Sequence, residues 1–522
     1  MIHQLSISVS PKQASENEAC KLVVAKKLQI KVSDITHFNI VRRSVDARGR
    51  NVRINLGVEV FVGELPDKSD LPGINYANVE NKPEVVIVGA GPAGLFAALR
   101  LIELGLKPVI VERGKDVSLR KADIAAIHRN EMVNPDSNYG FGEGGAGTFS
   151  DGKLYTRSKK KGDIRKILQV LHQHGAQSEI LIDAHPHIGT NVLPRVIVAI
   201  RKTILEHGGK IYFNQRVNDF VLQNGKMVGV KTLNGEKYTG IAVILATGHS
   251  ARDMYKLLRQ KGIHLEAKNF AVGVRVEHPQ ALIDQIQYHR PNRGEYLPAA
   301  SYSFVSQVDG RGVYSFCMCP GGVIVPASTA PDEMVVNGMS PSHRGGLFAN
   351  SGIVTEIRMG DLKQYQHHRE MAGLKFQEDL EHKCFQMAGQ SQMAPAQRLT
   401  DFVNGKNPSV LNKTSYHPGI IPSDMHRWLP VEVAGRLREG FNIFNQKARG
   451  FLSDEATVMG VESRTSSPIR IPRNETTFEH VTMPGLFPCG EGAGYAGGIV
   501  SSAVDGERCA DKVAEMAGLI VA

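Results

Sequence analysis

The run VVIVGAGPAGL at residues 85–95 constrains the fold more than any other stretch of this 522-residue chain. Val85–Val88 is typical of a buried β-strand, and three glycines follow it at the spacing Gly-x-Gly-x-x-Gly. Pro92 stands where the first turn of a helix accepts proline, and the helix is predicted to run to about Leu104. The apolar run Val109–Val111 then predicts a second strand. Strand, glycine turn, helix and strand in this order predict a βαβ unit in a parallel sheet.

Glycine is required at each of these three positions for a different physical reason. The first permits the tight turn, the second lets the backbone approach a pyrophosphate, and the third lets helix and strand pack closely. The helix N-terminus adds amide donors and a positive dipole end. Glu112 follows the second strand, where a carboxylate can accept both ribose hydroxyls of an adenosine and would repel a 2′-phosphate. The motif therefore predicts a dinucleotide site that disfavours NADP. Its predicted contacts are Gly89, Gly91, Pro92, Ala93, Gly94 and Glu112.

The C-terminal run GLFPCGEGAGYAGGIVSSAVDGERCA (485–510) reads as strand, glycine turn and helix. It resembles the C-terminal FAD segment of the flavoproteins with two dinucleotide-binding domains. In that family an acid after the strand binds the ribityl chain or the pyrophosphate, and the helix N-terminus stabilises reduced flavin. By this resemblance the cofactor is FAD. The implied contacts are Gly490, Glu491 (where aspartate is more usual), Gly498, Ile499 and Val500.

Two further segments belong to the same resemblance. A meander of short strands is predicted to begin near Ile211 and to end in VILATG (243–248), which resembles the ATG segment of these flavoproteins. The run FGEGGAGTFSDGKL (141–154) resembles their glycine-rich loop, which lies against pyrophosphate and flavin. Four separated segments would thus converge on one ligand. The implied contacts are Val217 (through its backbone, at the adenine), Thr247, Gly248, Gly144, Gly145, Gly147 and Thr148, with Arg113 and Arg120 as further candidates.

Three more runs and the N-terminal module narrow the resemblance to one family. The runs are SFCMCPGGVIVPAST (315–329), NGMSPSHRGGLFANSG (337–352) and GVESRTSSPIR (460–470). With them the chain resembles, over nearly its whole length, a bacterial family of uncharacterised FAD-dependent dehydrogenases with a glutathione-reductase-like FAD fold. What carries over from that family is the fold and the FAD.

The first eighty residues form a unit of their own. Ser15 and Glu18 suggest a capping box for a helix to about Leu28, and alternating runs near Ile35–Val45 and Val52–Val62 predict a hairpin. Periodicity weakens between about 270 and 425, which indicates a more irregular domain. The expected fold is α/β: a β-α-β-β module (1–80), a linker (66–83), a Rossmann-type FAD-binding domain in two parts (83–270 and 425–522), and an inserted α+β substrate domain (271–424).

The composition of the chain constrains its expected cellular location and its partners. The start of the chain does not read as a signal peptide, no apolar run is long enough for a membrane helix, and six irregularly spaced cysteines suggest reduced thiols, so we expect a cytoplasmic protein. The formal net charge is +10. Arginines at 42, 43, 48, 50 and 53 could hold RNA, but a solvated hairpin end is the preferred interpretation, and nucleic acid is an unlikely partner.

The predicted function is that of an FAD-dependent oxidoreductase, with hydride transfer between flavin N5 and a small-molecule substrate bound between the two large domains. Outside the FAD segments the sequence offers no second Gly-x-Gly-x-x-Gly that would house NAD(P)H, and it has no Cys-x-x-Cys. Electrons would therefore come from the substrate, from transiently bound NAD(P)H, or from a protein donor. Alternatives are an FAD-dependent RNA-modifying enzyme and a flavin-bound sensor without turnover. A monooxygenase stays open as a subclass.

No catalytic residue and no metal site are predicted. His249, Arg344 and Arg464 could line a pocket for an anionic or polar substrate, although surface ion pairs explain each as well. Cys317 and Cys319 are expected to share one strand face as buried structural cysteines. Cys489 is likewise expected to be a packed small residue.

Overall fold

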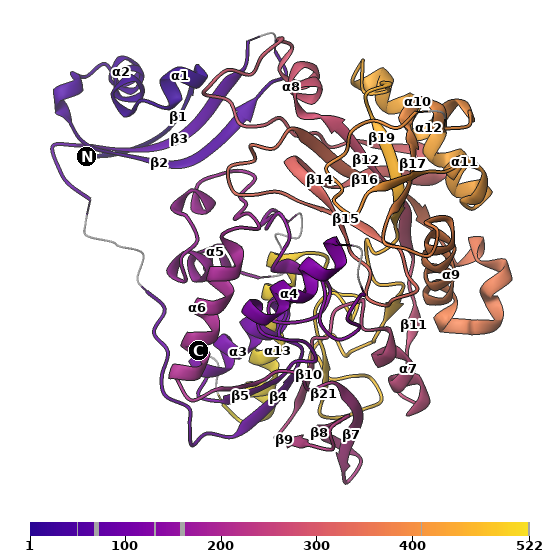
Figure 1. The fold of residues 1–522 in the computed structure, drawn as a ribbon. Coiled ribbons are helices and arrows are strands. Elements are labelled where there is room, and N and C mark those ends of the chain that lie inside the picture. The colour runs from indigo at the N-terminus through magenta and orange to yellow at the C-terminus, as the bar shows by residue number, and fades with distance from the viewer. Residues whose placement is uncertain (50, 67–72, 130–131, 157–161, 409, 520–522) are drawn as a thin grey trace.

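A computed structural model of the protein describes residues 1–49, 51–66, 73–129, 132–156, 162–408 and 410–519. The chain forms a small N-terminal module, a layer built on a five-stranded parallel sheet, and a layer built on a larger, mainly antiparallel sheet (Figure 1). The expected α/β fold with a Rossmann-type sheet is confirmed.

The N-terminal module is a three-stranded antiparallel sheet with helices packed on it. Its order is β1-β3-β2, as the β-α-β-β prediction requires. The predicted capping box is wrong: Ser10 and Gln13 form it, at a short helix that opens on Pro11, and Ser15 Oγ instead donates to the Lys12 carbonyl. The elements are β1 (Ile2–Val9), α1 (Pro11–Ala14), α2 (Asn17–Leu28), a 3₁₀ turn (Val32–Asp34), β2 (Ile35–Asp46) and β3 (Arg53–Val62). The predicted linker lies partly outside the described residues.

The parallel sheet has the order β21-β10-β4-β5-β6. Alternate residues of β4 enter opposite cores: Val85 and Ile87 pack with the helices, and Val86 and Val88 pack with the meander. A strand buried on both faces is continuously apolar, which is why this segment was recognisable. The strands are β4 (Glu84–Val88), β5 (Lys107–Val111), β6 (Lys210–Tyr212), β10 (Val243–Leu245) and β21 (Leu486–Pro488).

Helices cover one face of this sheet and a small meander covers the other. The strand near Ile211, expected to open the meander, instead joins the parallel sheet as β6. The helices of this layer are α3 (Pro92–Glu103), α4 (Val117–His128), α5 (Ile164–Gln173), α6 (Leu193–Glu206), α7 (Arg252–Gln260) and α13 (Ile499–Met516), with 3₁₀ turns at Gly145–Gly147 and Ser178–Leu181. The meander is β7 (Val217–Gln223), β8 (Lys226–Thr232) and β9 (Lys237–Thr239).

The region expected to be irregular is an extended sheet of order β13-β14-β16-β12-β19-β17-β18, with β15 on β14. Its strands escaped prediction because β12 is buried along nearly its whole length and bulges interrupt β14. The sheet continues to Glu462, so the predicted boundary at residue 424 falls inside this layer. The strands are β12 (Phe270–Pro279), β13 (Val305–Val308), β14 (Arg311–Pro326), β15 (Val336–Met339), β16 (Phe348–Ile357), β17 (Ala394–Arg398), β18 (Ile420–Pro422) and β19 (Thr457–Glu462).

Helices pack against this second sheet. They are α8 (Gln280–Tyr288), α9 (Ala372–Met387), α10 (Leu399–Asn404), α11 (Met425–Trp428) and α12 (Val431–Lys447), with 3₁₀ segments at Met359–Asp361 and Lys363–Met371. A two-stranded ribbon, β11 (Glu266–Ala267) with β20 (Ile469–Arg470), stands apart from both sheets.

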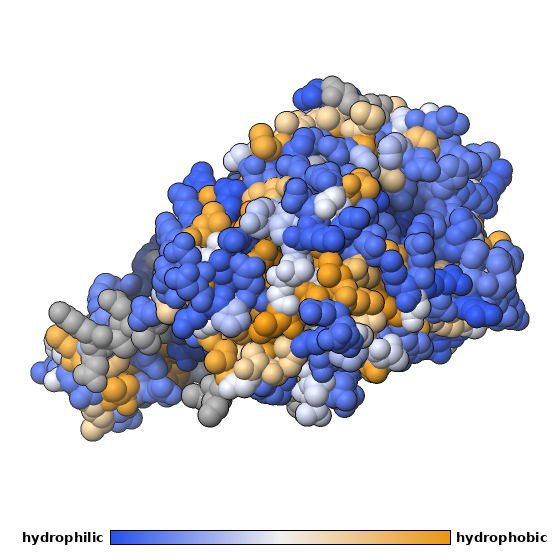
Figure 2. Space-filling model, turned by 90° about the horizontal axis from the view of Figure 1, so that it is seen from below, coloured by the Kyte–Doolittle hydropathy of each residue, from blue (hydrophilic) through white to orange (hydrophobic). Residues whose placement is uncertain are grey.

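The surface seen from below is mostly hydrophilic, with hydrophobic residues gathered toward its middle (Figure 2). Apolar atoms normally form a large part of a folded protein's surface. In the described part of the chain, no helix is both long enough and apolar enough to cross a membrane.

Candidate cofactor site

A cavity of about 390 Å³ opens at the carboxyl ends of β4, β5 and β10. Helices α3 and α13 both begin at its wall, and they pack against each other so closely that a Cβ at Gly506 would lie 2.1 Å from the Ala93 carbonyl oxygen. Two helix N-termini at one cavity supply unpaired amides and positive potential. The carboxyl edge of a parallel sheet is also where open α/β folds bind ligands.

All four segments of the predicted site reach this cavity. The lining residues among the predicted contacts are Gly89, Gly91, Pro92, Ala93, Glu112, Arg113, Gly145, Gly147, Val217, Thr247, Gly248, Glu491, Gly498 and Ile499. The structure thus brings together segments about four hundred residues apart (89 and 491). As contacts of a bound cofactor, these residues stay predictions.

Six predicted contacts lie behind the cavity wall: Gly94, Arg120, Gly144, Thr148, Gly490 and Val500. Arg120 is fully buried and donates to the carbonyl oxygens of Asn138, Glu143 and Tyr139 at 2.7–2.8 Å. Thr148 Oγ1 donates to the Glu143 carbonyl as well. Both side chains therefore hold the glycine-rich loop in shape instead of facing a ligand.

The buried glycines serve packing. A Cβ at Gly94 would lie 2.0 Å from the Gly89 carbonyl oxygen, which confirms its predicted role in helix–strand packing. A Cβ at Gly144 would lie 2.0 Å from Thr148 Oγ1, and one at Gly490 would lie 2.9 Å from Ala93 Cβ. Val500 is buried in the helix-side core.

The glycines at the wall leave space that a side chain would fill. A Cβ at Gly91 would meet nothing closer than Gly145 Cα at 4.0 Å, and Cβ atoms at Gly248 and Gly498 would meet nothing within 4 Å. Gly89 has a φ of +104°, and the chain after β10 passes so near that a Cβ there would lie 2.6 Å from the Ala246 carbonyl oxygen. This arrangement fits a pyrophosphate resting on backbone amides.

Glu112 is buried, and its carboxylate is already engaged. Oε2 accepts a hydrogen bond from the Ala90 amide at 2.8 Å, and Oε1 accepts from the Gly114 and Gly142 amides at 2.9 and 3.0 Å. A carboxylate offers about four acceptor positions. Glu112 therefore joins three loops and has room for one ribose hydroxyl, not the two that the sequence suggested.

Arg113 and Glu491 stand in the wall with partners of their own. Arg113 lies 4.0 Å from the centre of the Phe141 ring and pairs with Asp136 and Asp253 at 2.7 and 3.0 Å. Glu491 lies 3.2 Å from His249 Nδ1, while the buried His249 Nε2 has no hydrogen-bond partner among the described residues.

Sequence reasoning missed the wall that the second sheet provides. Lys153, Phe316, Cys317 and Asn337 line the cavity alongside the predicted loops. Lys153 Nζ lies 3.2 Å from the Asp151 carboxylate, and a third of its side chain is exposed. The run 141–154 contained this lysine, but its resemblance pointed only to the glycines. Only the packing of the two layers reveals Lys153.

Cys317 departs from the prediction. A register shift between Phe316 and Cys319 breaks the strand alternation, and Cys317 has a φ of +49°. Cys317 lines the cavity, whereas Cys319 is buried behind it. The two side chains therefore do not share one face of a regular strand.

The charged groups suggested for a substrate pocket occur as ion pairs. Arg464 lines the cavity, yet it pairs with Glu333 at 2.5 Å and Glu381 at 2.7 Å. Arg344 pairs with Asp151 at 2.9 Å and lines a neighbouring cleft of about 1210 Å³. The positive charge of both arginines is thus largely compensated.

Comparison with known proteins agrees with this geometry. Residues 82–131 match the FAD binding domain family, residues 269–465 match the family described as FAD-dependent protein, C-terminal domain-like, and residues 1–61 match a domain of unknown function (DUF8436). An uncharacterized protein of Clostridium beijerinckii is 38% identical over 511 residues, which is 94% of this chain and 95% of that protein.

More distant relatives match a smaller share of this chain. Protein FixC of Salmonella typhi is 26% identical over 220 residues (40% of this chain, 47% of FixC). The tRNA uridine 5-carboxymethylaminomethyl modification enzyme MnmG of Endomicrobium trichonymphae is 24% identical over 173 residues (33% of this chain, 26% of MnmG). The flavin-dependent brominase Bmp2 superposes with a TM-score of 0.39 at 14% identity, covering 84% of this chain and 80% of its own.

The family models and the glycine-lined cavity point to one ligand. The cradle at Gly91, the two helix N-termini and the buried Glu112 fit FAD. The chain belongs to the family of the C. beijerinckii protein, a family of FAD-dependent proteins.

Proposed function

We propose that the protein is an FAD-dependent oxidoreductase that transfers a hydride between flavin N5 and a small-molecule substrate held between the two large layers. The observation that carries this proposal is the shared cavity: the FAD segments, with Lys153 among them, line one part of it, and Phe316, Cys317 and Asn337 of the second sheet line another. FAD, when bound, supplies hydride acceptance and donation.

The chain's own residues would bind and orient the FAD. The amides at the start of α3 would hold the pyrophosphate, and Glu112 would accept a ribose hydroxyl on its remaining acceptor position. The N-terminus of α13 would favour the negative charge of reduced flavin. These contacts fix the cofactor before any substrate arrives.

Lys153 is suited to hold positive charge beside the reacting groups. Burial lowers the pKa of its ammonium, but the sulfur atoms of Cys317 and Cys319 and the Asp151 carboxylate outweigh this and raise the pKa above its usual value. The group therefore stays protonated across the physiological range. A fixed cation in a sheltered site stabilises charge that develops during reaction.

A second cavity gives a path for the substrate. The 1210 Å³ cleft lies between the N-terminal module and the rest of the molecule. Arg344 lines this cleft and is paired with Asp151, which lines the FAD cavity, so the two spaces meet at that pair. Lys447 and Arg449 line the cleft as basic residues and favour a polar or anionic substrate, whereas Arg43 and Arg344 are paired with Asp183 and Asp151.

The electron partner follows from what the motifs provide. The Gly-x-Gly-x-x-Gly spacing occurs only within the predicted FAD segments, and α8 follows β12 without such a turn. Electrons would come from the substrate, from transiently bound NAD(P)H or from a protein donor.

Anaerobic reduction of the purified flavoprotein tests the proposal. We expect bleaching of the flavin absorbance by one fraction of a metabolite extract, with NADH and NADPH as separate arms. Failure of every hydride donor would replace the proposal with a flavin-bound sensor. Rapid oxygen consumption with oxygen inserted into the substrate would make the protein a monooxygenase. Protein that neither contains nor binds FAD would contradict the cofactor assignment itself.

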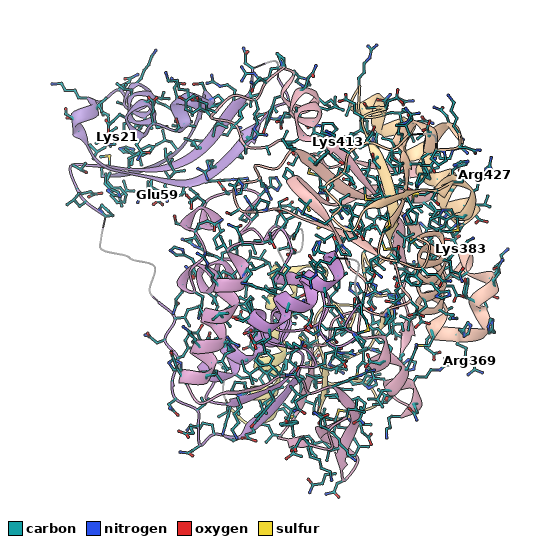
Figure 3. All side chains as sticks on the ribbon, in the orientation of Figure 1. Lys21, Glu59, Arg369, Lys383, Lys413 and Arg427 are labelled. Carbon is teal, nitrogen blue, oxygen red and sulfur yellow. The ribbon has the colours of Figure 1, made fainter. Side chains whose placement is uncertain are left out.

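An RNA-modifying role receives less support. In the N-terminal hairpin Arg43 pairs with Asp183, Arg48 pairs with Asp46, and Arg53 donates to the Ser8 carbonyl; Arg50 lies outside the described residues. The labelled charged residues lie on widely separated parts of the molecule (Figure 3): Lys21, Glu59, Arg369, Lys383, Lys413 and Arg427. Retention on an RNA column that falls steeply with salt would favour RNA, and indifference to salt would remove it.

A further inference from the structure

Two thiols share one cation at the wall of the cavity. Lys153 Nζ lies 3.7 Å from Cys317 Sγ and 3.4 Å from Cys319 Sγ. Arg275, fully buried on β12, adds a second cation: it donates to the Cys317 carbonyl at 2.8 Å and lies 3.5 Å from Cys319 Sγ. Neighbouring cations favour thiolate, which is the nucleophilic form of cysteine.

The position of Cys317 is unusual for a structural cysteine. Of the six cysteines, Cys317 is the one that is not fully buried, and the space it meets is the FAD cavity. Its φ of +49° is a left-handed conformation that non-glycine residues adopt mainly where the surroundings impose it. By contrast, Cys384 is fully buried on α9, and burial raises the pKa of its thiol.

We propose that Cys317 and Cys319 form a redox-active dithiol and that the substrates of this site are compounds containing a disulfide bond. This inference rests on the proposed oxidoreductase function and names its substrate class. The pair lies on β14 of the second sheet, at the wall that faces the predicted FAD segments.

The electrostatics separate the roles of the two thiols. A hydrogen bond with Cys319 lowers the pKa of Cys317, and Lys153 and Arg275 lower it further, against opposition from burial and from Asp151. The same hydrogen bond and burial raise the pKa of Cys319. Cys317 is therefore the attacking thiolate and Cys319 the resolving thiol.

The other charged group near the pair is accounted for. Glu462 on β19 lies 2.9 Å from Arg275, and burial raises the pKa of its carboxyl to about 7 although Arg275 opposes this. A Glu462 carboxyl that is partly protonated at neutral pH interacts less strongly with Arg275. The guanidinium lies 3.5 Å from Cys319 Sγ while it also pairs with Glu462.

The reaction balances as a thiol–disulfide exchange. The Cys317 thiolate attacks one sulfur of the substrate, a bond forms between the two sulfur atoms, and the substrate's own S–S bond breaks. The departing thiolate takes the Cys319 proton, and the Cys319 sulfur then attacks Cys317 and releases the second thiolate, which is protonated by solvent. The substrate gains two electrons, the dithiol loses two, and the reductant that restores the dithiol is reduced FAD.

The test uses the full-length, prereduced holoprotein without oxygen and 5,5′-dithiobis(2-nitrobenzoate) as the disulfide probe. We expect the wild type to release two equivalents of thionitrobenzoate from the dithiol in a fast phase and two more once reduced FAD has restored the dithiol, and to end with a Cys317–Cys319 disulfide by mass spectrometry. Cys319→Ser should release one equivalent and keep a mixed disulfide on Cys317. Cys317→Ser should lose the fast phase, and the matched control Cys384→Ser should behave as the wild type.

A second measurement needs no cysteine variant. The rate of Cys317 alkylation by iodoacetamide should exceed that of the other cysteines at pH 7, and Lys153→Met should slow it about tenfold by raising the thiol pKa. Alkylation of Cys317 no faster than Cys384, or a wild-type mixed disulfide that never resolves, would overturn the proposal. A reducible flavin with inert thiols would reject the dithiol alone, and reactive thiols with an irreducible flavin would reject the oxidoreductase function.

Discussion

At the scale of single residues, neighbouring glycines of one turn have different structural roles. Gly91 has an extended backbone (φ −76°, ψ −177°) and faces open space, whereas Gly94 abuts the Gly89 carbonyl. The motif spacing is the same in either case, so only the surroundings distinguish ligand binding from packing.

The pair Gly91→Ala and Gly94→Ala tests this division. Gly91→Ala should leave the melting temperature of the apoprotein unchanged and weaken FAD binding at least tenfold, about 1.4 kcal/mol, because its methyl group occupies the pyrophosphate space. Gly94→Ala should lower the apoprotein melting temperature by several degrees. Thermal melts and fluorescence titration with FAD measure both effects. Wild-type FAD affinity in Gly91→Ala would refute the cradle.

Glu112 provides a second residue-scale prediction. In Glu112→Gln one carboxylate oxygen becomes an amide nitrogen, so at least one of the Ala90, Gly114 and Gly142 amides loses its buried acceptor. We expect a loss of about 1–3 kcal/mol in the free energy of unfolding. Urea denaturation of the apoprotein measures it, with Glu59→Gln as control, because Glu59 accepts one exposed bond from Gln4. Equal stability of the two variants would argue against the role of Glu112 in joining the loops.

At the scale of elements, one buried carboxylate ties helices to the cofactor wall. Glu381 on α9 lies 2.7 Å from Arg252 on α7 and 2.7 Å from Arg464, which lines the FAD cavity. Burial raises the pKa of Glu381, but the two arginines overcome burial and hold the pKa at about 2. The carboxylate is therefore charged at any pH where the protein works.

This pKa sets a pH window for stability. Because the folded pKa of Glu381 lies below its ordinary value of 4.5, its stabilisation is complete above pH 4.5 and is lost as pH falls toward 2. Glu381→Gln should cost about 3–5 kcal/mol at pH 7, since two buried arginines then share Glu333 as their one remaining carboxylate, and the difference from wild type should shrink as pH falls below 4. Urea midpoints measured from pH 7 to pH 3 check this.

The same helix supplies the control. Glu378 pairs with the exposed Lys256 at 2.8 Å, so Glu378→Gln should cost less than about 1 kcal/mol. A Glu381→Gln cost as small as this, or one independent of pH, would contradict the network.

At the scale of the whole molecule, the N-terminal module is attached by few polar contacts. Arg43 pairs with Asp183 at 2.6 Å, and the Arg43 backbone bonds with Ile182 and Ala184. The large cleft lies beneath this contact. Loss of the contact would therefore change the shape of the proposed substrate path.

Charge reversal probes that attachment. Arg43→Asp and Asp183→Arg should each increase the radius of gyration measured by small-angle X-ray scattering, because like charges then face each other. The double variant should restore the wild-type value by re-forming the pair in the opposite sense. Unchanged scattering in both single variants would show that the backbone bonds hold the module alone.

Predictability differed between the two sheets for physical reasons. The parallel strands are short, apolar and followed by glycine turns, so β4, β5, β10 and β21 were found from local pattern. In the second sheet β12 is buried with Arg275, Glu277 and His278 inside it, and polar residues in a buried strand erase the pattern. Their partners come from distant strands, so local pattern could not anticipate them.

The sequence by itself determined most strands of the parallel sheet, the N-terminal module and a dinucleotide site at the glycine turns, because short apolar strands, tight turns and helix starts depend on neighbouring residues. FAD as the occupant was implied by the family resemblance. Only the tertiary structure decided that Arg120 holds a loop, that Glu112 has room for one hydroxyl, and that Lys153 meets Cys317 and Cys319. Those roles depend on which atoms are within hydrogen-bonding distance, and that distance is set by packing between segments far apart in the chain.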